Sequence, residues 1–112
     1  MSEIDNAGSV NPRARKLYEQ EYQHGAALFE KALVQANKSS YAPQKEQFSG
    51  VMDMAMKVLN QSAAELKRQD LVEQNKKIAQ DYKTYQSNPS KEHLDALKND
   101  LEKAKKSIRP LP

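Results

Sequence analysis

The chain has 112 residues with a formal net charge of +3; 38% of the residues are hydrophobic, 29% are charged, and cysteine and tryptophan are absent. This length and composition predict one domain with a narrow core, which excludes a deep ligand cavity lined on all sides. The lack of cysteine excludes disulfide scaffolds, thiolate zinc sites and cysteine nucleophiles, and no apolar run approaches the roughly 18 residues of a membrane-spanning helix.

Helix-breaking residues divide the chain into helical segments. Residues 1–10 show no periodicity and are predicted to be a disordered N-terminal segment. Asn11 before Pro12 is typical of a helix start, because asparagine caps the first turn and proline suits the first helical position. Asn88 or Ser90 would cap the last helix in the same way. The predicted helices cover residues 12–37, 43–86 and 90–108 of a single domain, 11–108, which a C-terminal tail, 109–112, follows.

No segment alternates between apolar and polar residues as a strand does, so the fold is predicted to be all-α. The first helix carries a seam with the alternating four- and three-residue spacing of a coiled coil. After the turn, the chain repeats this spacing, and the two seams match in an antiparallel hairpin. Gly25 then faces Leu59, which gives this mid-helix glycine a reason in packing. The two seams are Tyr18, Tyr22, Gly25, Phe29, Ala32 and Ala36, and Phe48, Met52, Ala55, Leu59, Ser62 and Leu66.

The second half of the chain predicts another antiparallel hairpin by the same spacing. One polar residue, Asn75, interrupts its apolar seams and faces Ala104. A polar seam residue often fixes the register at some cost in stability. The seams are Leu71, Asn75, Ile78, Tyr82 and Tyr85, and Leu94, Leu97, Leu101, Ala104 and Ile108.

The joint between the hairpins allows two structures, because the second seam is displaced from the first by roughly 140° around a helix. In one, two tandem antiparallel hairpins share a long central helix over residues 43–86. In the other, this helix breaks near Asp70, where Asp70 and Glu73 have capping-box spacing, and the hairpins form a four-helix bundle. We favour the long helix, because neither glycine nor proline interrupts the joint.

Several apolar residues lie outside the seams. They suit the edge of a core, where methionine fills gaps, and they equally suit a stripe that accepts a helix of another protein. The candidate partner-binding residues are Leu17, Leu28, Val34, Met54 and Met56.

The excess of positive charge lies in the second half of the chain, where residues 61–112 carry eleven Lys or Arg and eight Asp or Glu. Cations near a helix C-terminus complement the helix dipole, and a basic face can also meet nucleic acid. The candidate basic face consists of Lys98, Lys103, Lys105, Lys106 and Arg109.

Residues suited to chemistry are sparse. Glu21 and His24 have the Glu-x-x-His spacing of di-iron bundles, but such a site needs a second Glu-x-x-His and two further glutamates. The only other histidine, His93, follows Ser90 at that spacing. The chain has no phosphate-binding loop, nucleophile elbow or histidine-rich zinc pattern. We therefore predict no metal site, no cofactor and no catalytic residue, and expect that the protein is not an enzyme.

Two short segments resemble parts of known families. The run from Glu21 to Leu33 resembles the second helix of a tetratricopeptide repeat, although no preceding repeat helix is present. The residues that match the spacing of this repeat helix are Tyr22, Gly25, Phe29 and Ala32.

The second resemblance lies around the break at residues 87–90. This turn and the leucines after it are similar to the helix–turn–helix of type III secretion needle subunits, with Lys91 in place of a second turn proline. The resemblance implies a part in a bacterial secretion apparatus. The residues that carry it are Ser87, Asn88, Pro89, Ser90, Leu94, Leu97 and Leu101. Neither resemblance identifies a family for the whole chain.

The predicted function is a protein–protein interaction module: an adaptor, a chaperone for a helical partner, or a small subunit of a larger assembly. We expect a cytoplasmic location, because no apolar signal segment follows the N-terminus. Binding of nucleic acid through the basic C-terminal helix is the alternative. Self-association through the apolar stripe is a third hypothesis.

Overall fold

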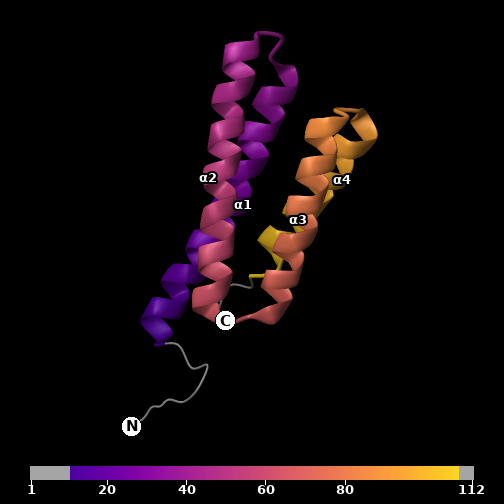
Figure 1. The fold of residues 1–112 in the computed structure, drawn as a ribbon. Helices are drawn as coiled ribbons and strands as arrows, with labels where there is room; N and C mark the ends of the chain where they lie inside the picture. The colour runs from indigo at the N-terminus through magenta and orange to yellow at the C-terminus, as the bar shows by residue number, and fades with distance from the viewer. Residues whose placement is uncertain (1–10, 109–112) are drawn as a thin grey trace.

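The computed structural model describes residues 11–108, and these residues form four helices and no strand (Figure 1). The all-α prediction is confirmed. The predicted N-terminal segment, 1–10, and the predicted tail, 109–112, lie outside the described residues. The helices are α1 (Pro12–Lys38), α2 (Ala42–Leu66), α3 (Gln69–Ser87) and α4 (Lys91–Lys106).

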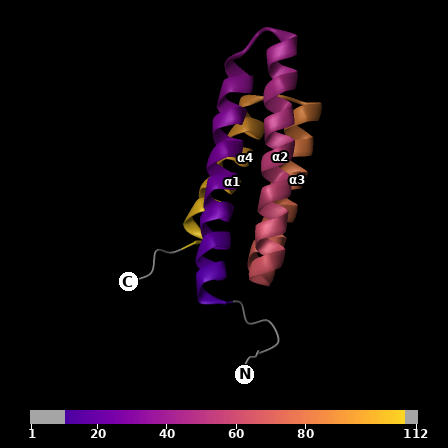
Figure 2. The ribbon, with the colours of Figure 1, turned by 90° about the vertical axis from the view of Figure 1, so that its left-hand side faces the viewer.

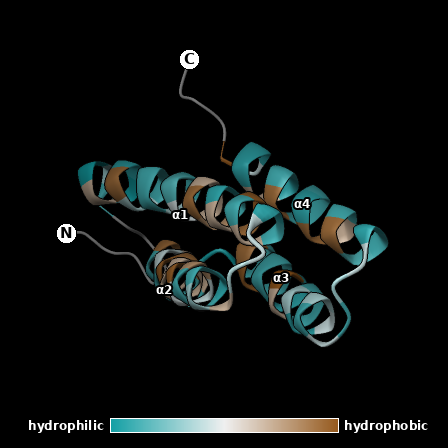
Figure 3. Ribbon diagram, turned by 90° about the horizontal axis from the view of Figure 1, so that it is seen from above, coloured by the Kyte–Doolittle hydropathy of each residue, from teal (hydrophilic) through white to brown (hydrophobic). Residues whose placement is uncertain are grey.

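The four helices run alternately up and down and lie at the corners of a bundle. Seen along the bundle, α4 lies beside α1 and α3 lies beside α2 (Figure 3). The molecule is elongated, with extents of 55 × 24 × 21 Å. The hairpin of α1 and α2 is the longer one, and its closed end extends beyond that of α3 and α4 (Figure 1). Within residues 11–108, no helix combines the length and apolarity needed to cross a bilayer.

Side chains cap two of the helices at their first turns. The Asn11 Oδ1 atom accepts a hydrogen bond from the Arg13 N–H at 2.9 Å, and Pro12 occupies the first helical position. Of the two candidate caps for the last helix, Ser90 is the N-cap. Its hydroxyl accepts a hydrogen bond from the His93 N–H at 3.2 Å. Each cap satisfies a backbone donor that the helix itself leaves unpaired.

The prediction of a continuous central helix over residues 43–86 was wrong. The helix is interrupted, as the alternative four-helix bundle requires. Helix α2 ends at Leu66, and Lys67 has the left-handed conformation, with φ 54° and ψ 38°. The Lys67 N–H donates to Ala64 O at 3.1 Å, and the Arg68 N–H to Ala63 O at 3.4 Å. This pair of bonds is the Schellman motif that closes a helix C-terminus.

The break precedes Asp70, and the predicted capping box is absent. Arg68 is the N-cap of α3 and makes no side-chain cap bond, while Glu73 accepts hydrogen bonds from Gln69 and Lys76. Residues 67–69 favour a helix by propensity, but a left-handed residue costs only about 1–2 kcal/mol. Burial of the second hairpin against the first is worth more, because each fully buried Leu or Ile contributes about 1.5–3 kcal/mol.

Replacing Lys67 by glycine is expected to stabilise the protein by about 0.5–1 kcal/mol, because glycine adopts the left-handed conformation without a Cβ penalty. Urea denaturation measures the change. The control Lys83→Gly makes the same substitution at an exposed mid-helix position and should destabilise by about 1 kcal/mol. Equal losses for both variants would argue against the left-handed turn.

The predicted seams form the core of the structure. Their residues are buried, except that Tyr18, Phe48 and Leu94 are half-buried against the core. A Cβ atom on Gly25 would lie 3.4 Å from the Leu59 Cδ2 atom. This distance agrees with the predicted pairing of Gly25 with Leu59.

Tyrosines connect the two hairpins across the bundle. The rings of Phe29 and Tyr82 meet edge to face, with centroids 5.1 Å apart and an interplanar angle of 80°. The Tyr82 hydroxyl donates to the Asp53 carboxylate at 2.9 Å, and the Tyr85 hydroxyl donates to Asn37 Oδ1 at 3.0 Å. Burial raises the pKa of Tyr82 to about 12. These contacts join α3 to both helices of the first hairpin.

Asn75 links three helices in the buried core. Its Oδ1 atom accepts a hydrogen bond from the Tyr22 hydroxyl at 2.8 Å, and its Nδ2 atom donates to Leu59 O at 2.9 Å. Burial raises the pKa of Tyr22, which keeps this hydroxyl a donor. The polar seam residue therefore pairs with the first hairpin, and its hydrogen bonds set the register between hairpins.

The Tyr22→Phe variant is expected to lose about 1–3 kcal/mol of stability, because Asn75 Oδ1 would remain buried without a donor. Thermal and urea denaturation measure the loss. The control Tyr18→Phe removes a hydroxyl from the same helix, where Tyr18 is only half-buried, and should change stability little. Combining Tyr22→Phe with Asn75→Ala should cost less than the sum of the single losses.

Candidate interaction surface

Within residues 11–108, one face of the α1–α2 hairpin has no other helix packed on it. Figure 2 views the molecule from this side, with α1 and α2 in front and α3 and α4 behind them. Leu28 and Met54 are exposed in α1 and α2, by 42% and 62%. A contiguous group of exposed apolar side chains on such a face is typical of protein-binding surfaces.

The register of the hairpin places these side chains together. A Cβ on Gly25 would lie 3.1 Å from Val58 Cγ1, which fixes the level at which α1 and α2 face each other. Leu28, Met54 and Val58 each directly precede a buried seam residue, so all three lie on the same side of the antiparallel pair. Val51 lies one turn from Met54 on that side. We call Leu28, Val51, Met54 and Val58 the outer patch.

Three of the five predicted partner-binding residues, Leu17, Leu28 and Met54, are exposed. Val34 and Met56 are half-buried, and Met56 packs against the core. Helical spacing puts Met56 on nearly the opposite side of α2 from Met54, so it does not join the outer patch.

Sequence analysis missed Val51 and Val58, which are half-buried beside Met54. Their spacing of three and four residues around Met54 is the helical signal that could have identified them.

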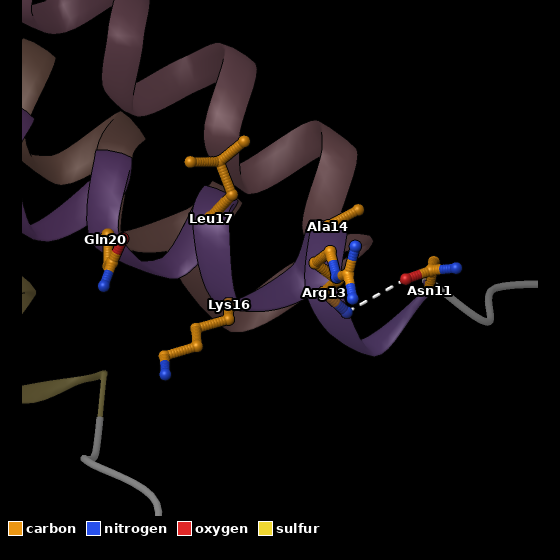
Figure 4. A pocket seen from close by; sticks show the side chains of 6 residues that line it. All are labelled: Asn11, Arg13, Ala14, Lys16, Leu17 and Gln20. Carbon is orange, nitrogen blue, oxygen red and sulfur yellow. Dashed lines mark hydrogen bonds between the residues drawn. The ribbon is translucent and has the colours of Figure 1, made fainter.

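Leu17 lies on the same side of α1 as Leu28, roughly 16 Å along the helix. It borders a shallow depression of about 440 Å³ in the first turns of α1 (Figure 4). The lining residues are Asn11, Arg13, Ala14, Lys16, Leu17 and Gln20. Figure 4 shows Leu17 on one side of the helix and Lys16 and Gln20 on the other. Side chains that diverge from one helix do not enclose a small ligand.

The predicted basic face is broken by ion pairs. Lys105 Nζ lies 2.6 Å from Glu30 Oε1 and also pairs with Glu102, and these hydrogen bonds raise the pKa of Lys105. Lys103 and Lys106 are exposed and Lys98 is half-buried, while Arg109 lies outside the described residues. Lys105 therefore serves the packing of α4 on α1.

The end of α4 is held by side chains of other helices. The Gln23 amide donates to Lys105 O at 3.2 Å and to Ile108 O at 3.1 Å, and Arg68 donates to Ser107 O at 3.4 Å. Arg68 also pairs with Asp70, whose pKa this hydrogen bond lowers. A polar depression of about 470 Å³ here carries both signs of charge and does not favour an ion of either sign. Its lining residues are Glu19, Arg68, Asp70, Lys106 and Ser107.

An acidic pair lies between α3 and α4. The side chain of Asp100 is buried close to the Asp81 carboxyl group, and its Oδ2 atom has no hydrogen-bond partner among the described residues. Burial, with the neighbouring Asp81 carboxylate, raises the pKa of Asp100 to about 7. The hydrogen bond from Asp100 lowers the pKa of Asp81, which Lys77 approaches to 3.0 Å. Within residues 11–108, no group of three or more His, Cys, Asp or Glu could hold a metal ion.

Comparison with known proteins assigns the chain to no family. No protein-family model matches the chain, and no curated protein or solved structure matches it either. The local resemblances to a tetratricopeptide repeat and to secretion needle subunits therefore receive no support from a match over the chain.

Proposed function

We propose that the protein is a non-enzymatic interaction module that binds a helical segment of another protein. It would act as an adaptor, a chaperone or a small subunit of a larger assembly. The observation that supports this proposal is the outer patch on the uncovered face of the α1–α2 hairpin. Leu28 and Met54 stand out from this face, and half-buried valines flank them.

The chemistry of the outer patch suits a helix in a groove. An amphipathic helix inserts apolar side chains at intervals of three and four residues, and the groove between two antiparallel helices accepts them. Methionine adapts its shape to such a partner, because its side chain is unbranched and polarisable. Full burial of a Leu or Met side chain contributes about 1.5–3 kcal/mol, so the patch needs polar contacts at its rim to reach micromolar affinity.

The test compares the double variant Leu28→Glu/Met54→Glu with Ala79→Glu/Gln86→Glu. Both variants gain two negative charges, but residues 79 and 86 are exposed positions of α3. Each tagged protein is purified from its native lysate after nuclease treatment, at 50 and 200 mM salt. We expect wild type and the α3 variant to retain a stoichiometric co-purifying protein at both salt concentrations. The amount of this protein that the patch variant retains should be lower by at least about tenfold.

The same experiment tests binding through the basic face. Co-purifying material that absorbs at 260 nm, disappears with nuclease and weakens steeply between 50 and 200 mM salt would favour nucleic acid. In that case the double variant Lys103→Glu/Lys106→Glu would no longer co-purify with nucleic acid, whereas the patch variant would still do so. Such a result would contradict the proposed function.

A further inference from the structure

On the uncovered face of the α1–α2 hairpin, two α1 residues of opposite charge flank the outer patch. Lys31 lies roughly 4.5 Å beyond Leu28 toward the closed end of the hairpin, and Glu21 lies roughly 10 Å before it. Helical spacing puts both charged residues on the side of α1 that carries Leu28. Both are exposed, and neither forms an ion pair with another described residue. Along α1 the outer patch is therefore flanked by a carboxylate on one side and by an amine on the side toward the closed end of the hairpin.

A surface with this order of charge is complementary to itself when inverted. A two-fold axis that lies in the plane of the interface and is perpendicular to α1 reverses the direction of α1 in the second copy and turns its uncovered face toward the first. It brings Glu21 of each copy to Lys31 of the other and sets one outer patch against the other. The midpoint between residues 21 and 31 falls within roughly 3 Å of Leu28 along the helix. Self-complementarity about one point is what a symmetric dimer requires.

We propose that the outer patch binds a second copy of this chain in an antiparallel, two-fold symmetric dimer, with Glu21 of each copy paired to Lys31 of the other. This inference deepens the proposed function, on which it rests, by naming an occupant of the same patch. The second copy presents the same apolar side chains, so each outer patch would cover the other.

The size of the face is sufficient for such a dimer. Helix α1 has 27 residues and α2 has 25, which corresponds to a length of about 40 Å. Two helices side by side span about 20 Å, because their axes lie 8–10 Å apart. The face thus offers roughly 800 Å² per copy, the area that a stable protein–protein interface buries on each side.

The test uses charge reversal and sedimentation equilibrium between 1 and 500 μM protein. We expect Glu21→Lys and Lys31→Glu each to raise the dimer dissociation constant about tenfold or more, because each places like charges together in the dimer. The double variant Glu21→Lys/Lys31→Glu should restore the wild-type constant. Within one chain these residues lie roughly 15 Å apart along α1, so only a pairing between copies explains the rescue.

The controls separate this inference from the proposed function. Lys83→Glu reverses an exposed charge on α3 and should leave the dimer constant unchanged, and circular dichroism confirms that every variant is folded. A monomer at all concentrations, or a dimer that the double charge reversal does not restore, would overturn the antiparallel dimer. Capture of another protein through the patch by a chain that stays monomeric would overturn the dimer alone. A rescued dimer that captures no other protein would uphold the dimer and contradict the adaptor function.

Discussion

Replacing Asp100 by asparagine is expected to stabilise the protein by about 1–3 kcal/mol at pH 8 and to change its stability little at pH 5. Asp100 is buried, and its Oδ2 atom accepts no hydrogen bond from the described residues. A buried polar group without a partner costs about 1–3 kcal/mol. The amide of asparagine can donate to Asp81 as the protonated acid does, but it carries no charge at any pH.

The pH dependence follows from the raised pKa of Asp100. Its pKa is about 7 in the folded chain, against an ordinary value of 3.8, with burial as the main cause. Between these values the folded chain holds a proton that the unfolded chain has released, so stability falls as the pH rises from about 4 to about 7. Asp81, whose pKa is lowered, acts in the opposite sense: its contribution is fully present above the ordinary pKa of an aspartate and is lost as the pH falls below that value, through the lowered pKa of the folded chain.

Urea denaturation at pH 5, 6, 7 and 8 measures this dependence for wild type and Asp100→Asn. The matched control is Asp95→Asn on the same helix, because Asp95 is exposed. Its ion pair with the Lys91 amine, at 3.7 Å, is exposed as well. The control should follow wild type throughout. If Asp100→Asn also follows wild type from pH 5 to 8, the pKa of Asp100 is not raised in the folded protein.

Replacing Gly25 by leucine is expected to destabilise the first hairpin by about 1–3 kcal/mol, as overpacking of a close helix–helix contact does. Even a Cβ atom at this position would lie 3.1 Å from a Val58 methyl group and 3.4 Å from Leu59. The larger side chain must therefore separate α1 from α2. This loss exceeds the gain of up to about 1 kcal/mol that leucine brings by its helix propensity.

The control for this variant is Gly50→Leu. Gly50 is also in a helix, but a Cβ there would meet nothing within 4 Å. This substitution should leave the midpoint of urea denaturation unchanged or raise it. An unchanged midpoint for Gly25→Leu would mean that Gly25 does not face Leu59 at close range.

The contacts within each hairpin could be predicted from the sequence, because a regular spacing of apolar residues determines them. Gly25 had to face Leu59 once the two seams were matched. The contacts between hairpins follow no such repeat. The hydrogen bond from Tyr22 to Asn75 joins residues 53 positions apart, and neither seam indicates which residues of the other hairpin it will meet.

The end of α2 was predicted wrongly because local propensity does not decide it. Lys67 is a good helix former, but the burial of two hairpins against each other outweighs the cost of one left-handed residue. The burial of Asp100 was also missed, because an aspartate in an amphipathic helix is normally exposed. For the outer patch, the sequence identified its two exposed members, Leu28 and Met54. The half-buried valines could be assigned only when the register and the uncovered face were known.

Because α4 packs on α1, the four helices form a closed arrangement around the core. Gln23 holds the carbonyl groups at the end of α4, and Lys105 pairs with Glu30. Because the first and last helices are neighbours, every helix packs beside at least two others, and none can detach without opening two interfaces. The two hairpins are therefore not independent units, as the members of an open repeat array can be. We therefore expect the four helices to unfold together as one cooperative unit.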